Sequence, residues 1–135
     1  MTDEARAILN DNLLGTVATI NEDGSPWNSP IHVFSDEEAV YWFSSEDRQH
    51  SLNVARNPRV SLTLFSPDLS EGPKGIFVNG NVTKLDVDAT TEARKLIEAK
   101  IGKIPPVFET ATAYRLPIGL LNSSKTSKNC WYFYS

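Results

Sequence analysis

The alternation of apolar and polar positions along the chain predicts short strands separated by turns. Apolar, β-branched runs recur through the sequence, and clusters of Gly, Pro, Asn, Asp or Ser separate them. The turn at residues 21–26 contains Asp23-Gly24, which predicts an antiparallel hairpin between its flanking strands. Pro30 places the second of these strands at an edge or a bulge, because proline cannot donate a ladder hydrogen bond. We expect strands at residues 14–20, 27–34, 40–43, 60–65, 76–82, 112–121 and 131–134, the sixth interrupted at Pro117.

Three other stretches are predicted to be helices, and the first and third repeat apolar residues at helical spacing. The first helix can be capped by Thr2 or Asp3, and the third by Asp88. Pro58 disfavours helix at the residue before it and helps to end the second helix, while Gly102 is expected to stop the third. The predicted helices span residues 3–12, 47–56 and 88–101.

The predicted elements favour a mainly β fold. Strands joined by short turns, with helices near the start, middle and rear of the chain, suggest a closed antiparallel β-barrel of six to seven strands with peripheral helices. Gly80 suggests a bulge or bend in the strand at 76–82. The chain has 135 residues, 40% of them hydrophobic and 22% charged, which predicts a single domain over residues 1–135.

Composition and charge exclude several classes of partner. A net charge of −4 argues against an extended nucleic-acid surface, which requires clustered Lys and Arg. Cys130 is the only cysteine, so no internal disulfide can form, and a reducing compartment is expected. Residues 1–12 lack the basic start and apolar block of a secretory signal, and no apolar stretch approaches the ~20 residues that span a bilayer. We therefore expect a soluble cytoplasmic protein without a membrane partner.

The sequence contains few candidates for metal binding or for nucleophilic catalysis. His32 and His50 are the only histidines, and neither belongs to a metal-binding motif, so each is expected to be hydrogen-bonded or exposed. No nucleophile-elbow motif is present, and Cys130 has no histidine near it in sequence, so we expect Cys130 to be a small buried apolar residue. The carboxylates lie mainly in turns and at exposed helix positions. No catalytic residue is assigned.

The segment from Ser44 to Ser51 is the best candidate for a ligand site. Ser44 and Ser45 follow an apolar strand and precede a helix, where hydroxyls and free backbone N–H groups suit phosphate oxygens. Arg48 adds a guanidinium that can bind phosphate through two hydrogen bonds. Further donors in the first turns of the helix are Gln49, His50 and Ser51.

A simpler interpretation of the same segment is that Ser44 or Ser45 only caps the helix. Glu46 and Asp47 would then complement the helix dipole, and either carboxylate would repel a phosphate that it faced. The spacing of the residues does not decide between a cap and a phosphate site. The large aromatic residues are expected to pack in the core, although one or two could line a flat ring: Trp27, Trp42, Phe43, Trp131, Tyr132 and Phe133.

Several pieces, in this order, resemble the FMN-binding split-barrel family, the pyridoxamine 5′-phosphate oxidase-like proteins. The resemblance covers roughly residues 14–85, and the ordered set is more specific than any one piece. The matching pieces are Leu14-Gly15-Thr16-Val17-Ala18-Thr19, Asp23-Gly24-Ser25-Pro26, Asn28-Ser29-Pro30-Ile31, Trp42-Phe43-Ser44-Ser45, Arg48-Gln49-His50-Ser51, Asn53, Asn57-Pro58-Arg59-Val60-Ser61 and Gly75-Ile76-Phe77-Val78-Asn79-Gly80.

The resemblance implies a split-barrel homodimer with FMN in a cleft between the subunits. By position, the flavin edge would contact, largely through backbone groups, Asn28, Ser29, Pro30 and Ile31. The ring and ribityl chain would lie beside Phe43, Ser44 and Ser45. The phosphate would be held by Arg48, Gln49, His50 and Ser51. Trp131 is expected to approach the ring from the last strand.

Two departures from the family pattern qualify this expectation. The family often carries Ser-Arg-Lys at the phosphate end, where this chain has Arg48-Gln49-His50 and no lysine. True pyridoxamine-phosphate oxidases also carry an Arg-rich C-terminal segment, whereas this sequence ends in NCWYFYS. We therefore expect a protein that does not oxidise pyridoxamine phosphate.

Three functions remain open at this level. The first is an FMN-dependent oxidoreductase with a small-molecule redox partner, in which the flavin performs the redox chemistry and no side chain need act as acid or base. The second is a non-catalytic module that binds a flavin or haem, and the third is a flavin-free dimeric barrel. Related barrels also use a deazaflavin, which is a further cofactor implied by the resemblance alone.

Overall fold

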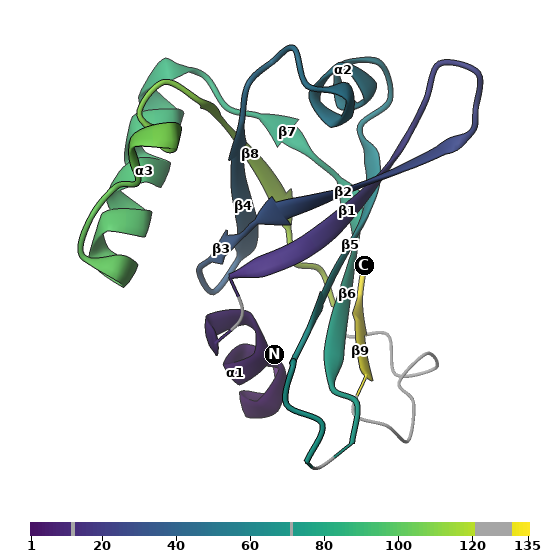
Figure 1. The fold of residues 1–135 in the computed structure, drawn as a ribbon, viewed down its shortest axis with the longest axis vertical. Helices are drawn as coiled ribbons and strands as arrows, with labels where there is room; N and C mark the ends of the chain where they lie inside the picture. Colours follow the sequence, from purple (N-terminus) through teal and green to yellow (C-terminus); the bar gives the residue numbers. More distant parts are fainter. Residues whose placement is uncertain (12, 71, 121–130) are drawn as a thin grey trace.

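A computed structural model describes residues 1–11, 13–70, 72–120 and 131–135 (Figure 1). The predicted positions of Cys130, of Leu121 and of the polar segment 122–129 lie outside these described residues. The helical elements are α1 (Asp3–Asp11), α2 (Gln49–Arg56), α3 (Val87–Ile101) and a 3-10 turn, η1 (Pro106–Phe108). The strands are β1 (Leu14–Ile20), β2 (Pro26–His32), β3 (Phe34–Ser35), β4 (Ala39–Ser44), β5 (Arg59–Phe65), β6 (Gly75–Asn81), β7 (Thr83–Lys84), β8 (Thr112–Pro117) and β9 (Trp131–Tyr134).

The strands form two sheets, which confirms the mainly β prediction. The larger sheet has the order β2-β1-β5-β6-β9, and the smaller has the order β3-β4-β8-β7. Seven of the nine strands contain four or more residues, matching the expected six to seven. Neighbouring strands are antiparallel except for β9, which runs parallel to β6 with Trp131 opposite Gly75. The closing strand at 131–134 is therefore present, in an orientation that the sequence did not predict.

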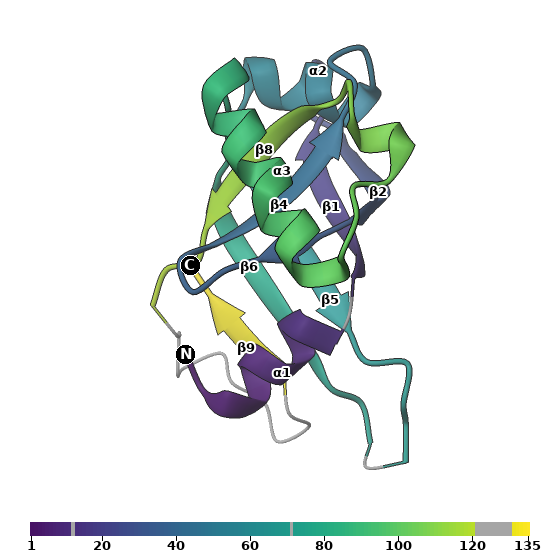
Figure 2. The ribbon, with the colours of Figure 1, turned by 90° about the vertical axis from the view of Figure 1, so that its left-hand side faces the viewer.

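The main core lies between the two sheets and is built from alternating positions. Val17 on β1 and Leu62 and Leu64 on β5 are fully buried, while their neighbours in sequence point to the opposite face. A second cluster fills the space between the smaller sheet and α3, which lies across β4 and β8 (Figure 2). The centre of this cluster contains Phe43, Ile97 and Phe108. The smaller sheet is thus covered on both faces.

Local chemistry explains most element boundaries and corrects some predictions. The Ala5 N–H donates to the Thr2 hydroxyl at 3.1 Å, which confirms the cap of α1. The cap of α3 is Asp86 rather than the predicted Asp88, because the Asp86 carboxylate accepts a hydrogen bond from the Ala89 N–H at 2.8 Å. Gly102 adopts a positive φ of 77° at the end of α3, as a C-terminal glycine should.

Two predicted features of the strands differ in the structure. The strand expected at 27–34 divides into β2 and β3 at Val33, whose N–H donates instead to the Leu13 carbonyl at 2.9 Å. Gly80 pairs with Val60 in the regular β5–β6 register, without the predicted bulge. A Cβ at this position would lie 3.3 Å from Leu116 Cδ1, so close packing against β8 accounts for the glycine.

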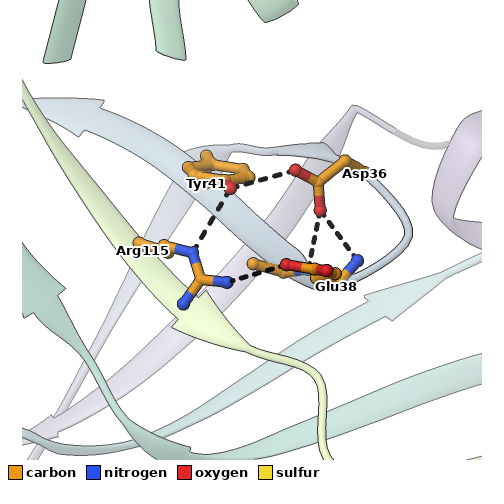
Figure 3. Close-up of polar contacts among 5 residues, drawn as sticks. Asp36, Glu38, Tyr41 and Arg115 are labelled. Carbon is orange, nitrogen blue, oxygen red and sulfur yellow. Dashed lines mark hydrogen bonds and ion pairs between the residues drawn. The ribbon is translucent and has the colours of Figure 1, made fainter. Parts of the chain in front are cut away.

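A set of polar contacts fixes the β3–β4 turn onto β8 (Figure 3). Tyr41 on β4 lies opposite Arg115 on β8, and its hydroxyl donates to Asp36 Oδ2 at 3.0 Å. Arg115 Nε donates to the Tyr41 hydroxyl at 3.3 Å, and its Nη2 lies 3.7 Å from Glu38 Oε2. The other Asp36 oxygen accepts the Glu38 and Ala39 N–H groups, each at 2.8 Å. Burial, as the largest effect, raises the pKa of Tyr41.

We expect the Tyr41→Phe variant to lower the free energy of unfolding by about 1–2 kcal/mol, because it removes a hydroxyl that both donates and accepts a hydrogen bond. Urea denaturation followed by circular dichroism measures this change. A variant with an unaltered denaturation midpoint would show that the Asp36–Tyr41–Arg115 contacts do not stabilise the turn. Glu38→Gln is the control, because its exposed ion pair is expected to contribute less than about 1 kcal/mol.

One face of the larger sheet is open to solvent. We call it the outer face, and the positions on it in β1, β2, β5 and β6 are Leu14, Thr16, Ala18, Ile20, Pro26, Asn28, Pro30, His32, Arg59, Ser61, Thr63, Phe65, Gly75, Phe77, Asn79 and Asn81. The helices lie elsewhere, with α1 and α2 at opposite ends of the sheet and α3 against the smaller sheet (Figure 1). Leu14 is 58% and Phe65 52% exposed on this face, and among these described positions Arg59 is the only one with a permanent charge. None of the described helices has the length and apolar character needed to cross a bilayer.

Candidate functional site

The structure brings together residues from β2, the end of β4 and the start of α2. Strand β2 is the edge of the larger sheet, and α2 packs against both β1 and β2. Strand β4 ends at Ser44, and a short connection leads from there to α2. These three segments, together with the connection between β4 and α2, carry eleven of the twelve site residues predicted from the sequence, so residues far apart in the chain converge in one region.

The centre of this region is a serine–histidine cluster formed by Ser29, Ser44 and His50. His50 Nε2 lies 2.8 Å from the Ser44 hydroxyl, and His50 Nδ1 lies 3.3 Å from the Ser29 hydroxyl. The indole N–H of Trp27 also donates to the Ser29 hydroxyl, at 3.1 Å. The cluster therefore ties β2, β4 and α2 together through side chains that can all form hydrogen bonds with an anion.

The surroundings of His50 favour the neutral form of its imidazole. Partial burial, followed by the positive charge of Arg48, lowers the pKa of His50 below its ordinary value of 6.5. The cluster thus supplies hydrogen bonds at neutral pH, while Arg48 supplies the permanent positive charge near it.

Helix α2 does not begin with a serine cap, which the simpler interpretation of this segment predicts. The helix begins at Gln49, two residues later than predicted, and Arg48 occupies the N-cap position without a side-chain capping bond. Neither Ser44 nor Ser45 caps it, since Ser44 contacts His50 and Ser45 accepts the Arg48 N–H through its carbonyl at 3.3 Å. The first-turn N–H groups of α2 are therefore not consumed by a capping side chain, which leaves them suited to an anion.

Glu46 does not oppose an anion in the way that its sequence position suggested. Its carboxylate lies 2.7 Å from the Lys84 ammonium and accepts a hydrogen bond from the Thr112 hydroxyl at 3.4 Å. The hydrogen bond and the charge of Lys84 lower the pKa of Glu46. These contacts hold the carboxylate toward β7 and β8, where Lys84 neutralises its charge.

Asn53 supports the site, although it is not among the site residues predicted from the sequence. It is fully buried, and its amide nitrogen donates to the Thr19 hydroxyl and to Asn21 Oδ1, each at 2.9 Å. Its amide oxygen accepts from Gln49 at 2.9 Å and from Arg56 at 3.2 Å. This network fixes α2 to the β1–β2 hairpin. Gln49, predicted to contact phosphate, donates a side-chain N–H to Asn53 Oδ1.

Other predicted residues take positions that limit how they could contact a ligand. Ser51 is buried, and its hydroxyl has no hydrogen-bond partner among the described residues. Phe43 and Ile31 are both buried, and the centroid of the Phe43 ring lies 5.6 Å from that of Phe108. Asn28 and Pro30 are exposed on the outer face. Trp131 lies on β9, which is separated from β2 by three strands within one chain.

The outer face carries two depressions beside these strands. One, of about 290 Å³, is bordered by Pro30 of β2 together with Leu14, Thr16 and Phe65. The other, of about 540 Å³, lies at the far end of the sheet and contains Arg59 and Asn79, but no predicted site residue. Within residues 1–11, 13–70, 72–120 and 131–135, no group of three or more His, Cys, Asp or Glu side chains could hold a metal ion.

Comparisons with known proteins agree with this architecture. The family model described as pyridoxamine 5′-phosphate oxidase matches residues 1–118. No curated protein matches the chain. Among solved structures, a protein described as an F420 reductase is 20% identical with a TM-score of 0.67, covering 87% of this chain and 95% of its own.

Two haem proteins have the same fold. A haem storage protein from Vibrio cholerae is 16% identical with a TM-score of 0.72, over 83% of this chain and 85% of its own. A haem-binding protein from Mycobacterium smegmatis is 22% identical with a TM-score of 0.70, over 84% of this chain and 49% of its own. This chain thus spans about half the length of the mycobacterial protein. At these identities the likeness shows the fold alone.

Proposed function

Because this chain belongs to the pyridoxamine 5′-phosphate oxidase family, we propose that it binds FMN at the β2–β4–α2 region and acts as a small flavin-dependent oxidoreductase. The observation that carries the proposal is the serine–histidine cluster beside the uncapped start of α2. Two hydroxyls, an imidazole, a guanidinium and free helix N–H groups form a donor set that matches phosphate oxygens. Phosphate is the part of FMN that such a region would fix.

The remaining assignments follow from the same orientation. With the phosphate at Arg48 and His50, the ribityl chain would pass Ser44 and Ser45, and the ring would lie along β2. As an edge strand, β2 has backbone groups that pair with none of the described strands and can hydrogen-bond the polar rim of a flavin. Asn28 and Pro30 would face the ring directly, whereas the buried side chains of Ile31 and Phe43 would support the backbone from behind.

We propose further that two copies pair through the outer face. The face is broad, almost uncharged and partly apolar, as expected of a surface that a second copy covers. A ring lying along β2 would then be enclosed at the subunit interface. Trp131, on the opposite edge of the same sheet, would approach the ring from the partner chain.

The chemistry of turnover would belong to the cofactor, which supplies hydride or electron transfer when bound. The chain would bind it, orient its ring and restrict access to it, and none of the described side chains need act as a general acid or base. The single cysteine suits a reducing cytoplasm, where a small-molecule redox partner would deliver or accept the electrons.

Haem is the second candidate ligand. His32 supports it, because this residue is exposed on the outer side of β2. Its ring makes an edge-to-face contact with Phe108, with 6.2 Å between the ring centroids. His32 could therefore offer a nitrogen to iron, whereas both nitrogens of His50 contact serines. A deazaflavin would use the same phosphate region as FMN.

The visible spectrum of the purified protein, alone and after separate addition of FMN, deazaflavin or haem, tests these candidates. A bound, two-banded flavin spectrum supports the proposal, and a Soret band with loss of binding in His32→Ala supports haem. Failure to retain added FMN would overturn FMN binding. If FMN binds, reduction by NADPH or NADH followed by reoxidation with an electron acceptor distinguishes an oxidoreductase from a flavin carrier.

We expect Arg48→Ala to weaken FMN binding by roughly ten- to a hundred-fold, because a charge-assisted hydrogen bond contributes about 1.5–3 kcal/mol. Quenching of FMN fluorescence measures the dissociation constant. Riboflavin, which lacks the phosphate, should bind both proteins alike. Arg6→Ala is the control, because Arg6 pairs with Glu37 at the α1 end of the molecule. Equal FMN affinities in Arg48→Ala and the wild type would reject the phosphate assignment.

A further inference from the structure

His50 occupies a position in which its ring can gain or lose a proton without moving. Each ring nitrogen faces a serine hydroxyl, Nε2 at 2.8 Å from Ser44 and Nδ1 at 3.3 Å from Ser29. A hydroxyl can donate to an unprotonated nitrogen or accept from a protonated one by rotating about its C–O bond. The same contacts therefore fit the neutral imidazole and the imidazolium.

The groups around His50 favour the neutral ring until an anion arrives. From α2 and its N-cap, the charge that acts on His50 is Arg48, which disfavours a second positive charge. The residues facing it from β2 and β4 are serines, and the Trp27 indole behind Ser29 is neutral. Glu46 is held by Lys84 on β7 and Thr112 on β8. No carboxylate in the described part of the chain hydrogen-bonds to His50.

We propose that His50 takes up a proton when a phosphate monoester binds, so that this site holds its cofactor more tightly as the pH falls from about 8 towards about 6. The inference rests on the proposed function, since the phosphate is that of FMN. Phosphate brings nearly two negative charges next to Arg48 and His50, which supply only one fixed positive charge between them. Protonation of His50 provides the second, where the family pattern has a lysine.

The direction of the effect follows from linkage. An adjacent dianion raises the pKa of His50 in the bound state above its value in the free state. Binding therefore strengthens as the pH falls through the bound-state pKa and levels off below the free-state pKa. One proton limits the slope to about tenfold in the dissociation constant per pH unit. Near pH ~6 the phosphate itself begins to take up a proton, which should end the gain.

The test compares the FMN dissociation constant of the wild type, His50→Gln and His50→Lys between about pH 6 and about pH 8. The wild type should bind several-fold more tightly for each unit of decrease over part of this range. His50→Gln keeps an amide donor and should bind more weakly with little pH dependence. His50→Lys should bind tightly at all these pH values. Riboflavin affinity should be flat in all three proteins, and circular dichroism confirms that each variant is folded.

Proton uptake gives an independent measurement. Calorimetry of FMN binding in buffers of different ionisation enthalpy should show uptake of a substantial fraction of one proton by the wild type near pH ~7, beyond that of His50→Gln. Equal proton uptake, or equal pH slopes, in the wild type and His50→Gln would overturn this inference while leaving FMN binding intact. Absence of FMN binding at every pH would overturn the proposed function and, with it, this inference.

Discussion

Asn53→Ala is expected to lower the free energy of unfolding by about 2–4 kcal/mol, the larger of the two stability effects predicted from the structure. The substitution removes four hydrogen bonds made by one fully buried amide. It also leaves the Thr19 hydroxyl, itself buried, without this partner. A buried polar group that loses its partner keeps its desolvation penalty, so the loss exceeds that of an exposed hydrogen bond.

Chemical denaturation measures this effect, and hydrogen exchange locates it. Amides of α2 should lose protection more than those of α3, because the Asn53 network attaches only α2 to the β1–β2 hairpin. Asn10→Ala is the matched control, since Asn10 is exposed and accepts one bond from Lys100. A loss no greater than that of Asn10→Ala would contradict the supporting role given to Asn53.

The second large effect concerns the proposed pairing of two chains. Thr63 lies in the middle of the outer face, between Thr16 on β1 and Phe77 on β6. Thr63→Arg would place an unpaired charge in the covered interface, at a cost of about 3–5 kcal/mol. The dimer should then dissociate roughly a hundred- to several-thousand-fold more readily. FMN affinity should fall with it, because the ring would lose the partner that encloses it.

Light scattering coupled to gel filtration measures the mass of each variant in solution. Thr91→Arg is the matched control, because this threonine is exposed on α3, against the other sheet, and the same substitution there should leave the mass unchanged. A monomeric wild-type protein would refute pairing altogether. A Thr63→Arg protein that remains dimeric would show that the interface does not lie on the outer face.

Much of the fold follows from local signals in the sequence. Asp23-Gly24 specifies the β1–β2 hairpin, and Pro30 correctly indicates an edge strand. The break at Val33 could not be predicted, because β2 pairs with β1 in the larger sheet whereas β3 pairs with β4 in the smaller one. The parallel direction of β9 is equally non-local, since β6 and β9 are separated by about fifty residues. Residue patterns specify elements better than they specify partners.

The candidate site divides in the same way. The segment from Ser44 to Ser51 is visible in the sequence because strand, hydroxyls and helix start follow one another. The contact of His50 with Ser29 joins residues 21 positions apart, and no periodicity in the sequence predicts it. Asn53 could have been suspected from its position four residues after Gln49, a spacing that places two amides on one side of a helix. Its partners, Thr19 on β1 and Asn21 just after that strand, are visible only in the fold.

The place of β2 in the sheet has a consequence for how the protein avoids aggregation. At the opposite edge, β9 covers β6, and the edge strands of the smaller sheet have only two residues each. The long free edge is therefore β2, where Pro26 and Pro30 lack the N–H groups that an added strand would need. A strand that tried to pair with β2 would find these two backbone hydrogen-bond donors missing, whereas a small ligand needs only a few hydrogen bonds. The edge proposed to receive a cofactor is thereby protected from polymerisation.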